Sequence, residues 1–130
     1  GIRDHCVTGV QACALPIFGV ECATPHGVAC GLMLPVALAV NAAAAWHDFA
    51  ILERAIDADA SADDLAAATA FVARINRLCL DAELPRRLSE VGLERGRLRW
   101  LAENSGGTSM RGNPVELSAA ALEAVLERAY

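Results

Sequence analysis

A long run without charge constrains the fold of this chain more than any other feature. Between Gly27 and Trp46 no residue is charged. A run of that length could cross a bilayer. Pro35, Asn41 and many alanines argue against a membrane span, and no arginine or lysine directly flanks the run to set its orientation. We therefore expect no membrane partner and a helix buried inside a protein.

The remaining sequence also favours helices. The chain of 130 residues is 55% hydrophobic with few aromatic residues, and much of that share is alanine, which favours helix. No stretch alternates polar and apolar residues long enough to indicate a sheet. There is no internal repeat and no low-complexity linker. The sequence predicts an all-α fold, a helical bundle of one domain with a core of its own.

The first half of the chain should contain three helices. One is expected over residues 27–44 with a bend near Pro35. A second is expected over residues 46–57, with Phe49, Leu52 and Ile56 on one face. Ser61 should cap a third helix that ends near residue 81. The apolar positions of this third helix follow helical spacing: Leu65, Ala68, Phe71 or Val72, Ile75, Leu78 and Cys79.

The second half should contain shorter helices. Pro85 should start a helix that Gly92 ends. Another helix is expected from residue 94 to the glycines at 106 and 107, followed by a loop over residues 108–114. Ser118 should cap a last helix that reaches the C-terminus.

Charge and cysteine content exclude several classes of function. The net charge is −5 and acidic residues are interleaved with the arginines, so a nucleic-acid partner is not expected. Five cysteines without a CxxC pair predict neither a disulfide framework nor a standard zinc site. Cys30 and Cys79 fall in apolar helical runs and should behave as small buried hydrophobes. A reducing cytoplasm is the expected location.

His26 is the candidate functional residue, because it stands between a proline and a glycine where the uncharged run begins. Taken alone, it could be a metal ligand held at a helix start or a helix-terminal residue without a catalytic role. His47 follows Trp46 and is interpreted as a surface or capping residue.

Three segments together resemble a known family. "PHGVACGLMLPVALAVN", "LPRRLSEVGL" and "GNPVELSAAALEAVLERAY" occur in that order. They resemble the C-terminal helical domain of iron-containing alcohol dehydrogenases, which have a dehydroquinate synthase-like fold. The resemblance covers residues 18–130, and those residues would form a C-terminal α-helical metal-binding domain.

The resemblance implies a metal ligand and a reaction. In that family one aspartate and three histidines hold a divalent metal, and the last histidine is the one in PHG, so His26 would be a metal ligand. Imidazole suits Fe(2+) or Zn(2+). The metal would polarise the oxygen of a small alcohol or aldehyde while hydride passes to or from NAD or NADP. Gly27 would let the backbone pack close to the site. A homo-oligomer is also expected.

Other residues of the family site are missing from the sequence. The family usually places an HxxxH pair before PHG, and this chain has Ala12 and Pro16 at those two positions. The aspartate and the nucleotide-binding domain would lie further upstream. We therefore expect an inactive fragment of a longer enzyme, with its catalytic and cofactor-binding residues upstream.

The first residues do not fit the family pattern. "GIRDHCVTGVQACALPI", residues 1–17, resembles a translated sequencing adapter of the kind met in metagenomic proteins. We interpret residues 1–17 as an artefact and reject a metal site built from His5, Cys6, Cys13 and Cys22. The alternative is a genuine N-terminal segment.

Two other functions remain open from the sequence. One is a maleylacetate reductase of the same fold. The other is a non-catalytic helical interaction module, in which a set of apolar residues would form the core: Leu32, Leu34, Leu38, Ile75, Leu78 and Leu98.

Overall fold

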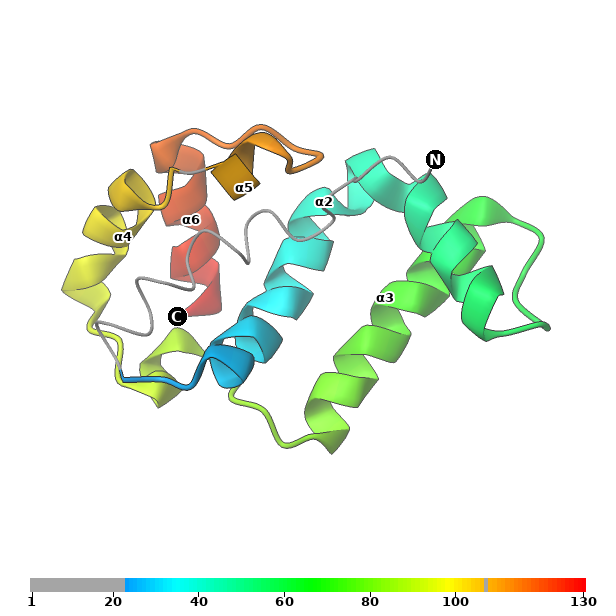
Figure 1. Ribbon diagram of the computed structural model, residues 1–130, viewed down its shortest axis with the longest axis horizontal. Coiled ribbons are helices and arrows are strands. Elements are labelled where there is room, and N and C mark those ends of the chain that lie inside the picture. Colours follow the sequence, from blue (N-terminus) through cyan, green and yellow to red (C-terminus); the bar gives the residue numbers. More distant parts are fainter. Residues whose placement is uncertain (1–22, 107) are drawn as a thin grey trace.

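The computed structural model describes residues 23–106 and 108–130, and within them all regular structure is helical (Figure 1). This confirms the predicted all-α class. The elements are α2 (His26–Ile56), α3 (Asp64–Asp81), the 3₁₀ helices η1 (Leu88–Val91) and η2 (Arg95–Arg97), α4 (Leu98–Asn104), α5 (Thr108–Arg111) and α6 (Ala119–Ala129).

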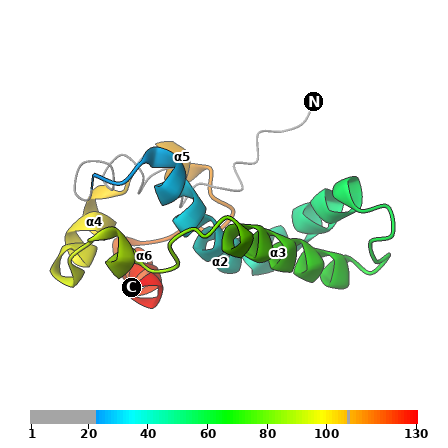
Figure 2. The same ribbon diagram turned by 90° about the horizontal axis from the view of Figure 1, so that it is seen from below.

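Helix α2 belongs to two hydrophobic cores. Figures 1 and 2 place α3 on one side of α2 and the α4 and α6 helices on the other. Leu32 and Met33 of α2 join the first, here called the α6 core, with Leu88, Leu98, Leu101, Leu122 and Leu126. Leu38 and Phe49 join the second, here called the α3 core, with Ala67 and Ala68. A helix buried on two faces has little room for charge, which accounts for the uncharged run.

The helix expected over 27–44 and the one expected over 46–57 are a single helix in the structure. Helix α2 begins at His26 and continues to Ile56. Its interior departure from helical geometry lies at Ala45, with φ −116° and ψ 15°, rather than at Pro35. The predicted boundary therefore corresponds to a kink inside one helix.

Pro35 leaves a carbonyl to be satisfied, and α3 contributes to this. A proline has no N–H to donate to the carbonyl four residues earlier, which here belongs to Gly31. The Cys79 thiol of α3 donates to that oxygen at an S···O distance of 3.8 Å. Burial raises the pKa of Cys79, which keeps the thiol protonated as a donor. Cys79 is half-buried rather than fully buried. Besides packing as a small apolar residue, it makes this contact with Gly31.

The start and the faces of α3 correct the sequence prediction. Asp63, not Ser61, caps the helix, because its Oδ1 accepts from the Ala66 N–H at 2.8 Å. Leu65 and Leu78 were expected in the core, yet they are 66% and 57% exposed. Phe71, Val72 and Ile75 pack against the α3 core as expected.

The second half of α2 also differs from its predicted face. Phe49 is fully buried as expected, but Leu52 is 40% exposed and Ile56 is 58% exposed. Glu53 is buried instead, next to Phe49 and Ala50. Beyond the kink, the helical spacing of apolar residues therefore predicted the wrong buried face, apart from Phe49.

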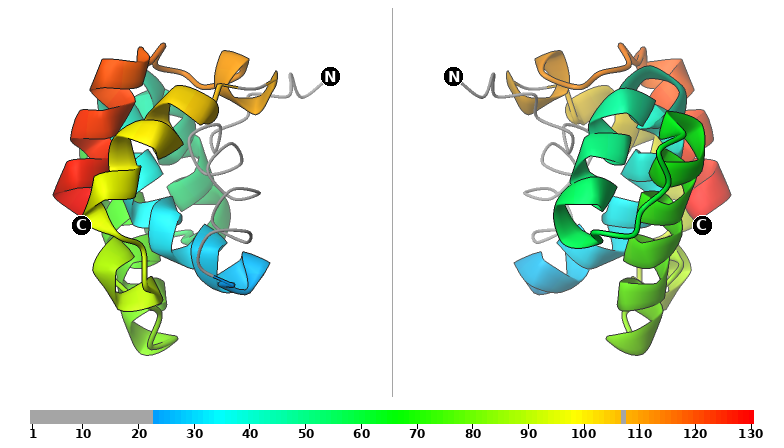
Figure 3. Two further views of the ribbon diagram at one scale, coloured as in Figure 1. Left: turned by 90° about the vertical axis from the view of Figure 1, so that its left-hand side faces the viewer. Right: turned by 90° about the vertical axis from the view of Figure 1, so that its right-hand side faces the viewer.

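The elements after α3 are shorter than predicted. The helix expected over 85–92 is the 3₁₀ helix η1, and Gly92 ends it in a left-handed conformation at φ 80°. The helix expected from residue 94 to the glycines at 106 and 107 is divided into η2 and α4, and the expected loop over 108–114 begins with the single turn α5. Ser118 caps α6 as predicted, with its Oγ accepting from the Ala121 N–H at 3.2 Å. Helices α4 and α6 lie side by side (Figure 3).

The left-handed conformation of Gly92 can be tested by substitution. Gly92→Ala should lower the free energy of unfolding by about 1 kcal/mol, because a Cβ is strained at positive φ. No atom would obstruct that Cβ, so the effect should come from the backbone alone. Gly96→Ala is the control, since Gly96 has equal space and no positive φ. Urea denaturation of both variants would show this, and equal losses would contradict it.

Helix α2 also satisfies a simple criterion for membrane helices. By length and composition it could cross a bilayer, with a mean hydropathy of 2.0 in its most apolar window. Of that window, 39% is buried inside this structure. Core helices of soluble proteins meet the same criterion, so its apolar character alone does not indicate a membrane protein.

Candidate functional site

His26 is the first residue of α2, and its side chain is exposed. The carbonyl of Pro25 accepts the N–H groups of Val28 and Ala29 at 3.0 and 3.1 Å, which starts the helix one residue earlier than expected. No side chain caps this end. The imidazole is therefore attached to the first turn of a long helix and is accessible to solvent.

The surroundings of His26 do not complete a metal site within the described residues. No three His, Cys, Asp or Glu side chains come together anywhere in residues 23–106 and 108–130. A Cβ added at Gly27 would meet no atom within 4 Å, so no described segment packs closely against this glycine. One imidazole does not hold a catalytic divalent metal. The positions His5, Cys6, Cys13 and Cys22 lie outside the described residues.

His47 lies in a surface ion-pair cluster, two residues beyond the kink of α2 at Ala45. Its Nδ1 is 2.7 Å from Asp64 Oδ2, and its ring stacks on Trp46 with centroids 3.9 Å apart. Arg54 Nη2 is 2.6 Å from Asp64 Oδ1. Arg54 also donates to the carbonyls of Ser61 and Ala62, so this cluster fastens the turn between α2 and α3. The prediction of a surface role for His47 agrees with this position.

The Asp64 cluster should make stability depend on pH. The hydrogen bond from Arg54 holds the pKa of Asp64 below its usual 3.8. A lowered folded-state pKa gives stability that is complete above the unfolded-state pKa and is lost as the pH falls through the folded-state pKa. Asp64→Asn should therefore lower the Tm at about pH 6 and have little effect at about pH 2. Thermal melts across that range would test this, and a pH-independent difference would contradict it.

A second ion pair lies deeper between α2 and α3. Glu53 is 2% exposed, and its carboxylate receives Arg74 Nη2 at 2.7 Å and Nε at 3.1 Å. Arg74 also donates to Asp57 at 2.7 Å. Hydrogen bonds to Glu53 and then Asp57 raise the pKa of Arg74. A backbone N–H from Asp59 and then Arg74 lower the pKa of Asp57. This network ties the two helices together and has no nucleophile or open space of its own.

A third polar contact joins residues far apart in the sequence. Asn41 of α2 and Asn113 exchange two hydrogen bonds through their side-chain amides, at 2.8 and 2.9 Å. Both residues are buried, and Asn113 donates further to the Val115 carbonyl at 2.7 Å. The pair connects the end of the "PHG…N" segment to the "GNP" segment. The sequence pattern gives the order of these segments but does not pair the two asparagines.

Comparison with known families relates this architecture to known enzymes. The model of the Fe-containing alcohol dehydrogenase family, C-terminal, matches residues 7–130. The chain belongs to the Fe-containing alcohol dehydrogenase family. The match begins upstream of residue 18, where the resemblance in the sequence begins. Residues 1–17 lie outside the described residues, and their interpretation as an artefact stays a prediction.

Two solved alcohol dehydrogenase structures have the fold of this family member. A 1,3-propanediol oxidoreductase structure superposes with a TM-score of 0.82 at 26% identity, over 94% of this chain and 32% of that chain. An alcohol dehydrogenase from Oenococcus oeni superposes with a TM-score of 0.79 at 27% identity, over 93% of this chain and 32% of that chain. The chain thus spans about a third of each of these proteins. No curated protein matches it.

Membership in the Fe-containing alcohol dehydrogenase family relates the chain to oxidoreductases. It also confirms the resemblance seen in the sequence. The family implies the use of a metal and of NAD(P). The described residues of this family member contain no group of three His, Cys, Asp or Glu side chains that could hold a metal.

Proposed function

We propose that this chain is the C-terminal helical part of a longer metal-dependent, NAD(P)-dependent alcohol dehydrogenase, and that His26 is one ligand of its metal. The observation that carries the proposal is the family match over residues 7–130. Its support is the likeness to two solved dehydrogenases over almost all of this chain but a third of theirs. The remaining ligands would come from the other part of the enzyme.

The substrate in this proposal is a small alcohol and its aldehyde or ketone. The solved structures are described as a 1,3-propanediol oxidoreductase and an alcohol dehydrogenase. The metal is Fe(2+) or Zn(2+), and the described residues alone do not fit a complete site for either. In this proposal His26 therefore binds the metal together with ligands from the rest of the enzyme.

The same proposal includes the location, the oligomeric state and the partners of the enzyme. It is a cytoplasmic homo-oligomer that binds neither nucleic acid nor membrane. An acidic net charge of −5 supports the first exclusion. Contacts of α2 with α3 and α6 support the second, because two faces of this helix pack against other helices of the chain.

One observation favours a second candidate, a non-catalytic helical interaction module. The His26 side chain is exposed and has no acidic or cysteine cluster around it in the described part of the chain. A non-catalytic scaffold would not need further metal-binding side chains near this histidine. Of its six expected core residues, Leu32, Leu38 and Leu98 are buried, whereas Leu78 is exposed.

Sequencing the DNA upstream of codon 18 separates the two candidates without any folding experiment. The dehydrogenase proposal expects an upstream frame with an HxxxH pair, a metal-binding aspartate and a glycine-rich phosphate loop. A start site directly before residues 1–17, with no such frame, would contradict it and favour the module.

The isolated chain should also lack the activity. The purified 130 residues, supplied with Fe(2+) or Zn(2+), should neither oxidise NADH with a small aldehyde nor retain the metal, because the metal ligands are incomplete. Absorbance at the nicotinamide band and metal analysis after gel filtration measure both. Metal-dependent turnover by the isolated chain would overturn the proposed division of the site.

A further inference from the structure

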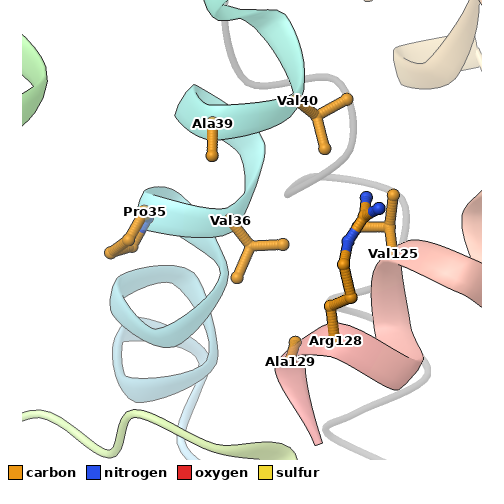
Figure 4. A pocket seen from close by; sticks show the side chains of 7 residues that line it. All are labelled: Pro35, Val36, Ala39, Val40, Val125, Arg128 and Ala129. Carbon is orange, nitrogen blue, oxygen red and sulfur yellow. The ribbon is translucent and has the colours of Figure 1, made fainter. Parts of the chain in front are cut away.

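A groove between α2 and α6 is not used by the proposed site. It has a volume of about 420 Å³, within the range of small-molecule sites. Its walls are apolar: Val36 and Val40 point from α2 toward α6, where Val125 lies opposite (Figure 4). His26 lies more than two helical turns from the nearest lining residue of α2, so the groove is separate from the candidate metal ligand.

Arg128 of α6 extends along this groove (Figure 4). No acidic residue among residues 23–106 and 108–130 lines it. Two other arginines, Arg77 and Arg99, each pair with a carboxylate four residues later in their own helix. Arg128 has Ala124 four residues earlier and makes no ion pair with any residue that the structure describes. The neighbouring Glu127 is already paired with Arg95 at 2.8 Å.

We propose that the groove between α2 and α6 binds a small molecule in which a carboxylate is joined to a linear apolar chain. The guanidinium of Arg128 would receive the carboxylate, and Val36, Val40 and Val125 would contact the apolar chain. The lined part of α2 spans residues 35–40, less than two helical turns. That length suits a small molecule better than a docked helix, which contacts its groove over several turns.

Octanoate is the first probe, and its binding to the purified chain is measured by NMR chemical-shift perturbation. Decanoate should bind severalfold more tightly than octanoate, since each fully buried methylene adds roughly fourfold. The uncharged 1-octanol should bind more weakly than octanoate. Arg128→Gln should weaken octanoate binding roughly fivefold, the loss expected for one exposed charge pair.

Two further variants complete the test. Arg87→Gln removes an exposed arginine that makes no ion pair with described residues, and it should leave octanoate affinity unchanged. Ala39→Leu fills the groove from an exposed position and should block binding without affecting the core. Equal affinity of the wild type and Arg128→Gln would overturn the proposal. So would a change of oligomeric state in Ala39→Leu, because a second copy of the chain would then be the occupant.

Discussion

Replacing His26 with alanine should reduce the metal affinity of a completed enzyme by more than about a hundredfold, since loss of a residue that only supports a ligand already costs 10–100-fold. The completed enzyme joins this chain to the upstream part of its own gene. The 130-residue chain carrying the same substitution should keep its Tm, because the His26 side chain is exposed and makes no contact that supports the cores. Metal content after dialysis and thermal melts measure the two effects.

His47→Ala is the matched control for His26. His47 is also an exposed histidine of α2, but it pairs with Asp64 near the far end of that helix. It should leave metal content unchanged and slightly lower the Tm. If the two variants lose metal equally, or neither loses any, His26 is not a ligand. The result then favours the interaction module.

Phe49→Ala should lower the free energy of unfolding by about 3–5 kcal/mol, the usual cost of removing a fully buried phenylalanine side chain. Phe49 is 0% exposed in the α3 core, and its ring centroid lies 5.6 Å from that of Phe71. Truncation would remove this ring pair and leave a cavity under α3. Urea denaturation followed by circular dichroism gives the difference directly.

Leu65→Ala serves as the control for Phe49. Leu65 is 66% exposed on the same helix pair, and its truncation should cost less than about 0.5 kcal/mol. If Phe49→Ala is unfolded in buffer, Phe49→Leu provides a milder step that should cost roughly 1–1.5 kcal/mol. Similar losses for Leu65→Ala and the Phe49 variants would mean that the α3 core is not as described.

Local sequence signals predicted the parts of the fold that depend on local chemistry. Ser118 and Gly92 act where the sequence placed them, because a cap and a left-handed turn need only their own neighbours. Ser61 failed as a cap since Asp63 stands two residues closer to the helix and offers its own oxygen. The Ser61 hydroxyl accepts from the Asp63 N–H instead.

The burial pattern was harder to predict, because it depends on partners. Leu78 has the spacing of a core residue, yet it stays exposed, although its neighbour Cys79 contacts Gly31 of α2. Glu53 has the composition of a surface residue, yet Arg74 from α3 makes its burial acceptable. Both outcomes depend on how α2 and α3 are placed relative to each other, which helical periodicity does not contain.

The candidate site was predicted through resemblance rather than through local chemistry. His26 stands out by its place between proline and glycine, but only the family pattern gives it a role. The Asn41–Asn113 contact joins residues 72 positions apart, and a single sequence carries no signal for such a pair. Both asparagines lie inside the segments that indicate the family, which is where a comparison of related sequences would look first.

The sharing of α2 between two cores has a consequence for biosynthesis. The α3 partner of α2 follows within a few tens of residues, so this helical hairpin can form while translation continues. The α6 partner is residues 119–129, which are synthesised more than sixty residues after α2 ends at Ile56. At a synthesis rate of about 5–20 residues per second, the side of α2 that packs on α6 stays exposed for several seconds. A nascent chain of this protein therefore exposes the α6-facing side of α2 during that interval.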